Sequence, residues 1–137
     1  MNEGDSLPTI EKLITQAQIQ KYAEASGDFN PVHIDMEFAK TTQFGGTIAH
    51  GMMIAAGVSE MMSVAFAKSW LENGRLKLRF KAPVRPGDSI ATFGTVKGVK
   101  VKVTEGAREL TCAVGIRKQD GEEVITGDAV VTLPQGR

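Results

Sequence analysis

Apolar residues at the start of the chain recur with a helical period. Ile19, Tyr22 and Ala23 lie three and four residues apart, and this spacing predicts an amphipathic helix over about residues 16–26. Thr15 and Gln18 have the spacing of a capping box, in which two side chains satisfy free backbone N–H groups at a helix start. Gly27 supplies a helix stop. Both ends of this first helix are therefore marked in the sequence.

The segment after this helix reads as turns and short pieces. Pro31 drives Asn30 toward an extended backbone and argues against helix at this point. Asp35 is placed to cap a short helical turn that runs through about Lys40. Residues 43–46 read as a loop.

A second, longer helix is apolar on nearly every side. It opens at Gly51, ends at Asn73-Gly74 and carries Met52, Met53, Ile54, Ala55, Ala56, Val58, Met61, Met62, Val64, Ala65 and Phe66. A helix of this kind is typical of the interior of a protein or of a membrane. Glu60 and Lys68 would be costly inside a bilayer, so we expect a buried helix and no membrane span.

After residue 74 the period changes to two, which is typical of strands. Leu76, Leu78 and Phe80 alternate with Lys77, Arg79 and Lys81 and predict a strand with one wet face. A turn over 83–88 leads to further strands at about 89–96, 107–117 and 123–133, with Asp120-Gly121 as a hairpin signal and a fifth run near 8–14. The pattern predicts a single α+β domain over residues 1–137, with an antiparallel sheet wrapped around the long helix.

Composition narrows the functional classes. Sixteen Lys and Arg balance sixteen Asp and Glu, and this zero net charge argues against a nucleic-acid binder. The lone Cys112 cannot form an internal disulfide, and the N-terminal residues lack the apolar segment of a secretory signal, so we expect a cytoplasmic protein. Only two histidines, His33 and His50, are available for imidazole chemistry.

The first candidate for chemistry is the segment from Asp28 to His33. A loop interrupted by Pro31 can turn an acid and an imidazole toward one point, and a carboxylate and a neutral imidazole around one water form an acid–base pair. Asn30 is available to orient either group. The alternative is a purely structural turn, because Gly-Asp and Asn-Pro are common turn formers.

The second candidate lies where the long helix begins. A helix N-terminus offers unpaired amides and a positive dipole end, both of which suit an oxyanion. Gly51 lets a ligand approach the backbone closely. For His50 we favour a structural role at the entry to the helix. Two histidines seventeen residues apart and one distant cysteine form no recognisable metal-ligand set, so we expect no metal.

These motifs together resemble the MaoC-like, (R)-specific enoyl-CoA hydratase family. The hydratase signature is matched by Tyr22, by Ser26-Gly27-Asp28-Phe29-Asn30-Pro31-Val32-His33 and by Ala39. The resemblance continues at Ala49-His50-Gly51-Met52, Phe80, Pro83-Val84, Gly87-Asp88 and Thr126-Gly127-Asp128-Ala129-Val130-Val131. Ala25 departs from the family pattern, which prefers a larger aliphatic residue or glycine there. An ordered match of this length is far more specific than any single motif.

The resemblance implies a hot-dog fold, homodimers and reversible hydration of trans-2-enoyl-CoA to (R)-3-hydroxyacyl-CoA, with the CoA thioester as substrate and no cofactor. By carry-over, Asp28 and His33 hold the water and transfer protons, and the Gly51 amide stabilises the enolate oxygen. Ser59 corresponds to a family serine that supports the catalytic carboxylate. It lies eight residues beyond Gly51, about 12 Å along a helix, so the two residues serve different atoms. The alternative for Ser59 is close helix packing.

Other interpretations remain beside this one. Methionines of the long helix fill a core, or some of them, Met52 and Met53 foremost, line an acyl tunnel. The same chemistry serves a dehydratase of (R)-3-hydroxyacyl groups on acyl carrier protein. A non-catalytic acyl-thioester-binding subunit of a hetero-oligomer is the alternative from another class, although Asp28 and His33 are both retained.

Overall fold

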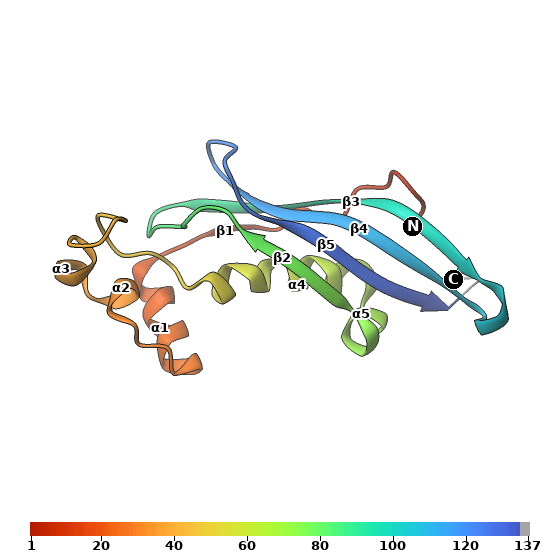
Figure 1. The fold of residues 1–137 in the computed structure, drawn as a ribbon, viewed down its shortest axis with the longest axis horizontal. Coiled ribbons are helices and arrows are strands. Elements are labelled where there is room, and N and C mark those ends of the chain that lie inside the picture. Colours follow the sequence, from red (N-terminus) through yellow and green to blue (C-terminus); the bar gives the residue numbers. More distant parts are fainter. Residues whose placement is uncertain (135–137) are drawn as a thin grey trace.

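The computed structural model describes residues 1–134, and its helices lie along one side of a five-stranded antiparallel sheet (Figure 1). The sheet order is β1-β3-β4-β5-β2. The strands are β1 (Glu11–Leu13), β2 (Arg75–Phe80), β3 (Ser89–Lys102), β4 (Ala107–Lys118) and β5 (Glu123–Pro134). The helices are α1 (Gln16–Ser26), α2 (Pro31–Ile34), α3 (Met36–Ala39), α4 (Gly51–Phe66) and α5 (Lys68–Asn73), with a 3-10 turn at Val103–Glu105. The predicted α+β arrangement is confirmed.

Strands β3, β4 and β5 form a meander with the predicted hairpin at Asp120-Gly121. Strand β3 runs six residues beyond the predicted end at Val96, to Lys102. A register shift between Val96 and Gly98 explains the difference, because a bulge moves the alternation from one face of the strand to the other. The local period therefore ends although the strand continues.

Within residues 1–134, strand β2 lies at an edge of the sheet and pairs only with β5. The expected dry face is mostly open, since Leu76 is 39% and Phe80 55% exposed while only Leu78 packs against the core. The alternation of β2 was thus read correctly, but within residues 1–134 little covers its apolar side.

The long helix predicted over 51–73 is broken into α4 and α5 at Ala67. Ala67 has φ 47° and is the one non-glycine residue with positive φ in the described part of the chain. Helix α4 buries one side against the sheet, whereas Met52 and Val64 on the helix are 66% and 63% exposed. The expectation of a helix enclosed on all sides is wrong for this single chain, because the sheet covers one side only.

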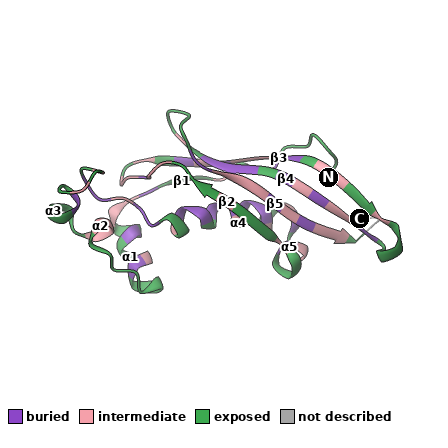
Figure 2. Ribbon diagram, viewed as in Figure 1, coloured by how far each residue is buried: buried purple, intermediate pink, exposed green. Residues whose placement is uncertain are grey.

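The core lies between the sheet and the facing side of α4 (Figure 2). Met61 and Met62 are completely buried, which confirms core filling for this pair. Their neighbours in the core include Val58, Val96, Leu110, Val114, Ile116 and Val131. Burial raises the pKa of the Cys112 thiol on β4 to about 11.

The predicted turn over 83–88 is present and is held by Asp88. Burial opposes ionisation of this carboxyl group, but the backbone N–H of Arg85, the Gln119 amide and the positive Lys118 together lower its pKa. The ammonium of Lys118 lies 3.4 Å from Asp88 Oδ2, and both side chains are largely buried.

The N-terminal helices follow their predicted caps. Thr15 and Gln18 form the complete capping box of α1, and Gly27 ends the helix with φ 77°. Asp35 caps α3 as expected. The expectation that Pro31 excludes helix is wrong. Asn30 is non-helical, with φ −54° and ψ 127°, but Pro31 is the first residue of α2, where its missing N–H has no helical partner to lose.

Among residues 1–134, no helix combines the length and the apolar content that a membrane crossing requires.

Candidate active site

Asp28 stands in a loop built from successive side-chain-to-backbone hydrogen bonds. The N–H of Asp28 donates to Ser26 Oγ, the N–H of Asn30 donates to Asp28 Oδ1, and the N–H of Val32 donates to Asn30 Oδ1, each at 3.2 Å. Asp28 therefore does cap a turn, as the structural alternative required. Its residue is nevertheless exposed and its carboxylate borders an open recess, so the turn places the acid at a surface where a ligand can reach it.

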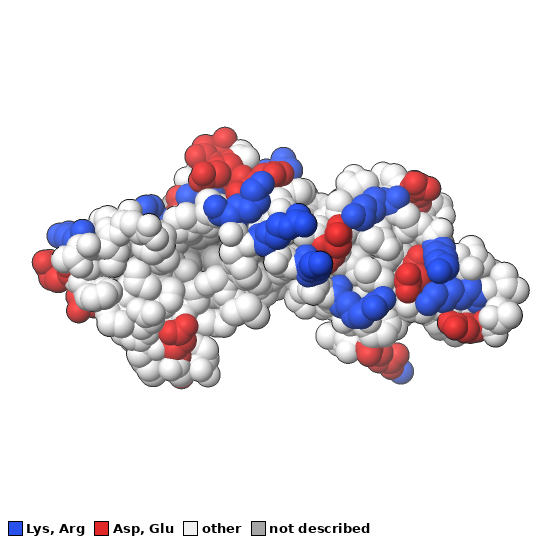
Figure 3. Space-filling view, viewed as in Figure 1, with Lys and Arg blue, Asp and Glu red and all other residues white. Residues whose placement is uncertain are grey.

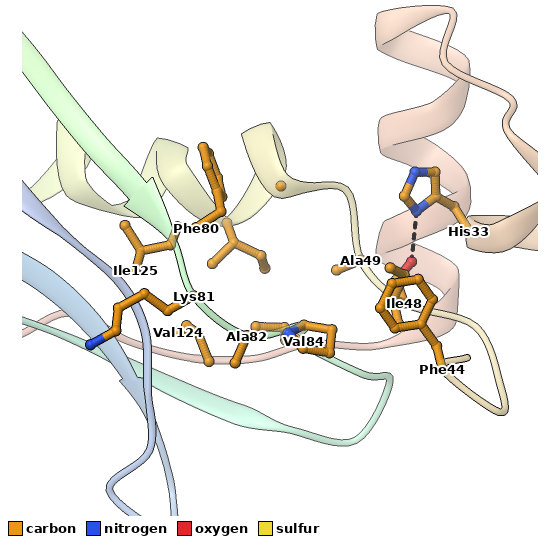
Figure 4. A pocket seen from close by; sticks show the side chains of 13 residues that line it. His33, Phe44, Ile48, Ala49, Phe80, Lys81, Ala82, Val84, Val124 and Ile125 are labelled. Atoms are coloured by element: carbon orange, nitrogen blue, oxygen red, sulfur yellow. Dashed lines mark hydrogen bonds between the residues drawn. The ribbon is translucent and has the colours of Figure 1, made fainter. Parts of the chain in front are cut away.

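His33 is fixed by a hydrogen bond between Nδ1 and the carbonyl oxygen of Ile48 at 2.8 Å (Figure 4). A carbonyl oxygen only accepts, so Nδ1 carries the hydrogen and Nε2 is left for chemistry. This is the arrangement that an acid–base histidine needs, because the tautomer and the ring orientation are both set before a substrate arrives.

Gln16 and Thr47 support this histidine, and no motif in the sequence indicated either residue. The amide of Gln16 donates to the backbone carbonyl of His33 at 2.8 Å and accepts from the Thr47 hydroxyl at 2.7 Å. Through these two hydrogen bonds, the first residue of α1 links α2 to the segment that carries Thr47 and Ile48. Only the fold brings these residues together, and no local spacing could have indicated it.

His50 joins the two candidate segments. Its side chain is 3% exposed, its Nε2 donates to the backbone carbonyl of Asp28 at 2.9 Å, and its ring stacks on His33 with the centroids 3.9 Å apart. The ring of Tyr22 packs against the ring of His50, with the two centroids 4.7 Å apart. The structural role favoured for His50 agrees with this burial, although its side chain makes no capping hydrogen bond to α4.

A carboxylate oxygen of Asp28 and one ring nitrogen each of His33 and His50 lie within 4.8 Å of one another. One water bridges such a gap, since two hydrogen bonds of about 2.8 Å meeting at a tetrahedral angle span roughly 4.6 Å. A metal fits less well. The stacked rings differ in plane by only 24°, and an ion would have to lie near both ring planes at about 2.1 Å from each nitrogen. The arrangement suits water and proton transfer.

Gly51 begins α4 directly after His50, so its amide belongs to the first turn and points away from any helical acceptor. A Cβ on this residue would lie 3.1 Å from Cε1 of Phe80. Phe80 therefore rests so close to the helix start that a Cβ at this position would require its ring to shift by a few tenths of an ångström. The positive end of the α4 dipole and the open amide lie beside Asp28 and His50 in one recess.

Two hollows meet at Gly51 and Phe80. The first is an apolar pocket of about 340 Å³ bounded also by His33, Phe44 and Ile48 (Figure 4). Its other walls come from Ile54 on α4, the segment from Lys81 to Val84 and the start of β5 at Val124 and Ile125. The second is a recess lined by Tyr22, Ser26, Asp28, His50 and Met52 as well as by Gly51 and Phe80. A small polar head at Asp28 and His33 thus has an apolar space next to it.

The remaining predicted residues lie in different surroundings. Met52 borders the second recess and Met53 packs against the core, and neither lines the apolar pocket. Ser59 Oγ accepts a hydrogen bond of 2.9 Å from Trp70 Nε1. Its predicted support of Asp28 stays a prediction. Asn30 caps α2 and binds the Asp28 carboxylate through its backbone N–H, which is a positional role.

Charge is distributed unevenly over the surface. Figure 3 shows Lys and Arg side chains gathered over the strands, while the end that carries α1–α3 has few charges on this face. Lys77 and Arg79 on β2 and Lys81 directly after it are exposed, and the ammonium of Lys81 lies 3.6 Å from a carboxylate oxygen of Glu123. These basic side chains form the predicted wet face of the strand.

Comparisons with known proteins agree with the motifs. The family described as MaoC like domain matches residues 2–115. A Rhodospirillum rubrum protein named (R)-specific enoyl-CoA hydratase is 34% identical over 134 residues, 98% of this chain and 89% of that protein. A Methylorubrum extorquens protein named 3-hydroxybutyryl-CoA dehydratase is 33% identical over 92% of this chain and 77% of its own. The structure of the Aeromonas caviae (R)-hydratase involved in PHA biosynthesis aligns over 98% of both chains with a TM-score of 0.80 and 30% identity.

Proposed function

This chain belongs to the MaoC-like family and has the hot-dog fold, and on that premise we propose that it is a hydro-lyase acting on acyl-CoA thioesters. The proposed reaction adds water to a trans-2-enoyl-CoA and forms the (R)-3-hydroxyacyl-CoA, and it runs reversibly. The observation that carries the proposal is the placement of Asp28 and His33 within 4.8 Å of each other beside the open amide of Gly51.

In the proposed reaction, Asp28 and His33 hold one water between them. One group removes a proton from the water as its oxygen bonds to the β-carbon, and the π electrons of the double bond move to the thioester oxygen. The other group delivers a proton to the α-carbon when the enolate collapses. The Gly51 amide and the α4 dipole stabilise the enolate oxygen. Asn30 positions the carboxylate, and Ser59 supports it from α4.

The apolar pocket accounts for the acyl chain. Its 340 Å³ lies at the small end of ligand pockets, and its walls are mainly aliphatic and aromatic. His33 and Gly51 line the same space, so an acyl tail in the pocket leaves its thioester end next to both. No bound cofactor takes part in the proposed chemistry, because CoA enters as part of the substrate.

The enzyme is proposed to work as a homodimer in the cytoplasm. In the described part of the chain, one edge of strand β2 is unpaired, and the apolar Met52, Val64 and Phe80 are each more than half exposed. A second copy would cover these groups and enclose the site. The free and buried Cys112 suits a reducing compartment.

The test is hydration of trans-2-enoyl-CoAs of increasing chain length. The reaction is monitored through the loss of the enoyl absorbance, and the configuration of the product is determined by chiral analysis. We expect the (R) product and an optimum among chains that fit the pocket. An (S) product would contradict the proposal. Faster turnover of the same acyl group on acyl carrier protein would favour the carrier-protein dehydratase. Binding of acyl-CoA without turnover of any chain would favour the non-catalytic subunit.

A further inference from the structure

His50 is buried at the first turn of α4, yet its side chain does not cap the helix. It is the N-cap residue, but its ring makes no hydrogen bond to the free amides of the first turn. An N-cap side chain ordinarily serves those amides. The ring of His50 is directed to other groups, and these are the two acid–base residues.

The hydrogen bond to the Asp28 carbonyl links an exposed loop to the rest of the fold. The other hydrogen bonds of Asp28 in residues 1–134 come from within the loop, to Ser26 and from Asn30. The bond from His50 spans twenty-two residues and is shorter, at 2.9 Å. It therefore fixes the loop relative to α4, which begins at the exposed Gly51.

The same ring supports His33. The two imidazoles are stacked with centroids 3.9 Å apart and planes tilted by 24°, and Tyr22 contacts the His50 ring at 4.7 Å. We propose that His50 is a positioning residue that fixes Asp28 and His33 relative to each other. This inference deepens the proposed function and rests on it. His50 itself transfers no proton in this proposal, because its Nε2 is occupied by the Asp28 carbonyl and its Nδ1 is buried away from solvent.

The second nitrogen of His50 separates positioning from a purely structural role. Nδ1 is buried and has no hydrogen-bond partner among the described residues. An unsatisfied buried nitrogen lowers stability, so a residue without it would serve the fold at least as well. If the ring served only the fold, its replacement would not be expected to lower the turnover of molecules that remain folded.

Two variants divide the ring's functions. His50→Gln keeps an N–H for the Asp28 carbonyl and removes the stacked ring, whereas His50→Phe keeps a ring against His33 and removes the N–H. For each we expect kcat to fall by about ten- to hundredfold with KM within about threefold, since small misplacements of acid–base groups have effects of this size. Thermal stability should stay near that of the unchanged protein in at least one of the two variants.

A matched control is Thr92→Val, which removes another buried polar link. Thr92 Oγ1 binds Pro8 and Ile10 at the sheet, away from Asp28 and His33. We expect this variant to lose stability and keep its kcat. If both His50 variants retain kcat within twofold, or if their activity falls only as far as their folded fraction falls, the inference is wrong.

Nitrogen NMR of ring-labelled histidine keeps the inference testable without turnover. Each His50 variant has a single imidazole, so the His33 signals need no assignment. We expect the Nδ1–H form of His33 in the unchanged protein and in His50→Phe, and a mixture of tautomers in His50→Gln. Identical His33 signals in all three proteins would overturn the inference. Absence of hydration by the unchanged enzyme would instead overturn the proposed function.

Discussion

The sheet with α4 and the segment that carries Asp28 and His33 are stabilised in different ways. The first is built from paired strands and completely buried side chains such as Leu110 and Met61. In the second, from residue 26 to residue 38, no residue is fully buried (Figure 2). Its order comes from caps, from hydrogen bonds between residues two positions apart, and from the ring of His50.

The difference teaches where stability and activity reside. Burial of apolar surface supplies most of the free energy of folding, and it lies almost entirely between the sheet and α4. The proposed catalytic groups lie where burial is slight, so their positions depend on a few directional contacts. A change in one region should therefore affect mainly stability, and a change in the other mainly turnover.

The largest expected effect is on the sheet. Leu110→Ala should lower the free energy of unfolding by about 2–5 kcal/mol, because Leu110 is completely buried and its loss leaves a cavity. Denaturant titration measures this change, with the exposed Leu71→Ala as control. Turnover per folded molecule should remain. Loss of turnover in fully folded Leu110→Ala would break the separation between the regions.

The next effect is on chemistry. Asp28→Asn should lower kcat by on the order of 10²-fold or more, since the amide neither accepts nor delivers the proton. Its stability should change little, because Oδ1 can still accept from the Asn30 N–H. Steady-state kinetics and thermal unfolding measure both quantities. Asp35→Asn, which keeps the cap of α3, is the matched control, and near-normal hydration by Asp28→Asn would refute the assignment.

Ser59 lies on α4 and is predicted to support Asp28 in the other region, so its substitution tests whether the two regions are linked. Ser59→Ala should cost about 1–3 kcal/mol of stability, because the buried N–H of Trp70 loses its acceptor. The predicted support of Asp28 adds a fall in kcat. Ser63→Ala, one turn further along α4, is the control. An unchanged kcat in folded Ser59→Ala would limit the role of Ser59 to Trp70.

The smallest expected effect is at the break between α4 and α5. Ala67→Gly should raise stability by about 1 kcal/mol, since Ala67 has φ 47° and glycine adopts positive φ without steric cost. Thermal unfolding measures the change. Ala56→Gly in the exposed interior of α4 provides the contrast, and it should lower stability by a similar amount. A lower stability for Ala67→Gly would contradict the interpretation that the positive φ of Ala67 is strained.

The sequence predicted features that depend on neighbours in the chain. The capping box of Thr15 and Gln18, the stop at Gly27 and the hairpin at Asp120-Gly121 are all present, because each needs only a few consecutive residues. The break at Ala67 was not predicted, since alanine favours helix and only the fold imposes its positive φ.

The same reason explains what was missed at the site. Resemblance to the family motif predicted Asp28 and His33 as site residues, but the residues that hold them in place come from segments far away in the sequence. Gln16 reaches the carbonyl of His33 across seventeen residues, and His50 reaches Asp28 across twenty-two. Contacts of this length depend on how α1, α2 and α4 pack together, and no period or spacing in the sequence records them.

The thiol of Cys112 can be used to measure how often the centre of the sheet becomes exposed to solvent. Its thiol is completely buried on β4 and its pKa is raised to about 11, so alkylating reagents meet almost no thiolate in the native state. Since no other cysteine is present, the rate of modification counts excursions that expose the centre of the sheet. Alkylation rates measured with and without a substrate thioester can therefore reveal whether binding at the recess beside Asp28 also slows the opening of the sheet.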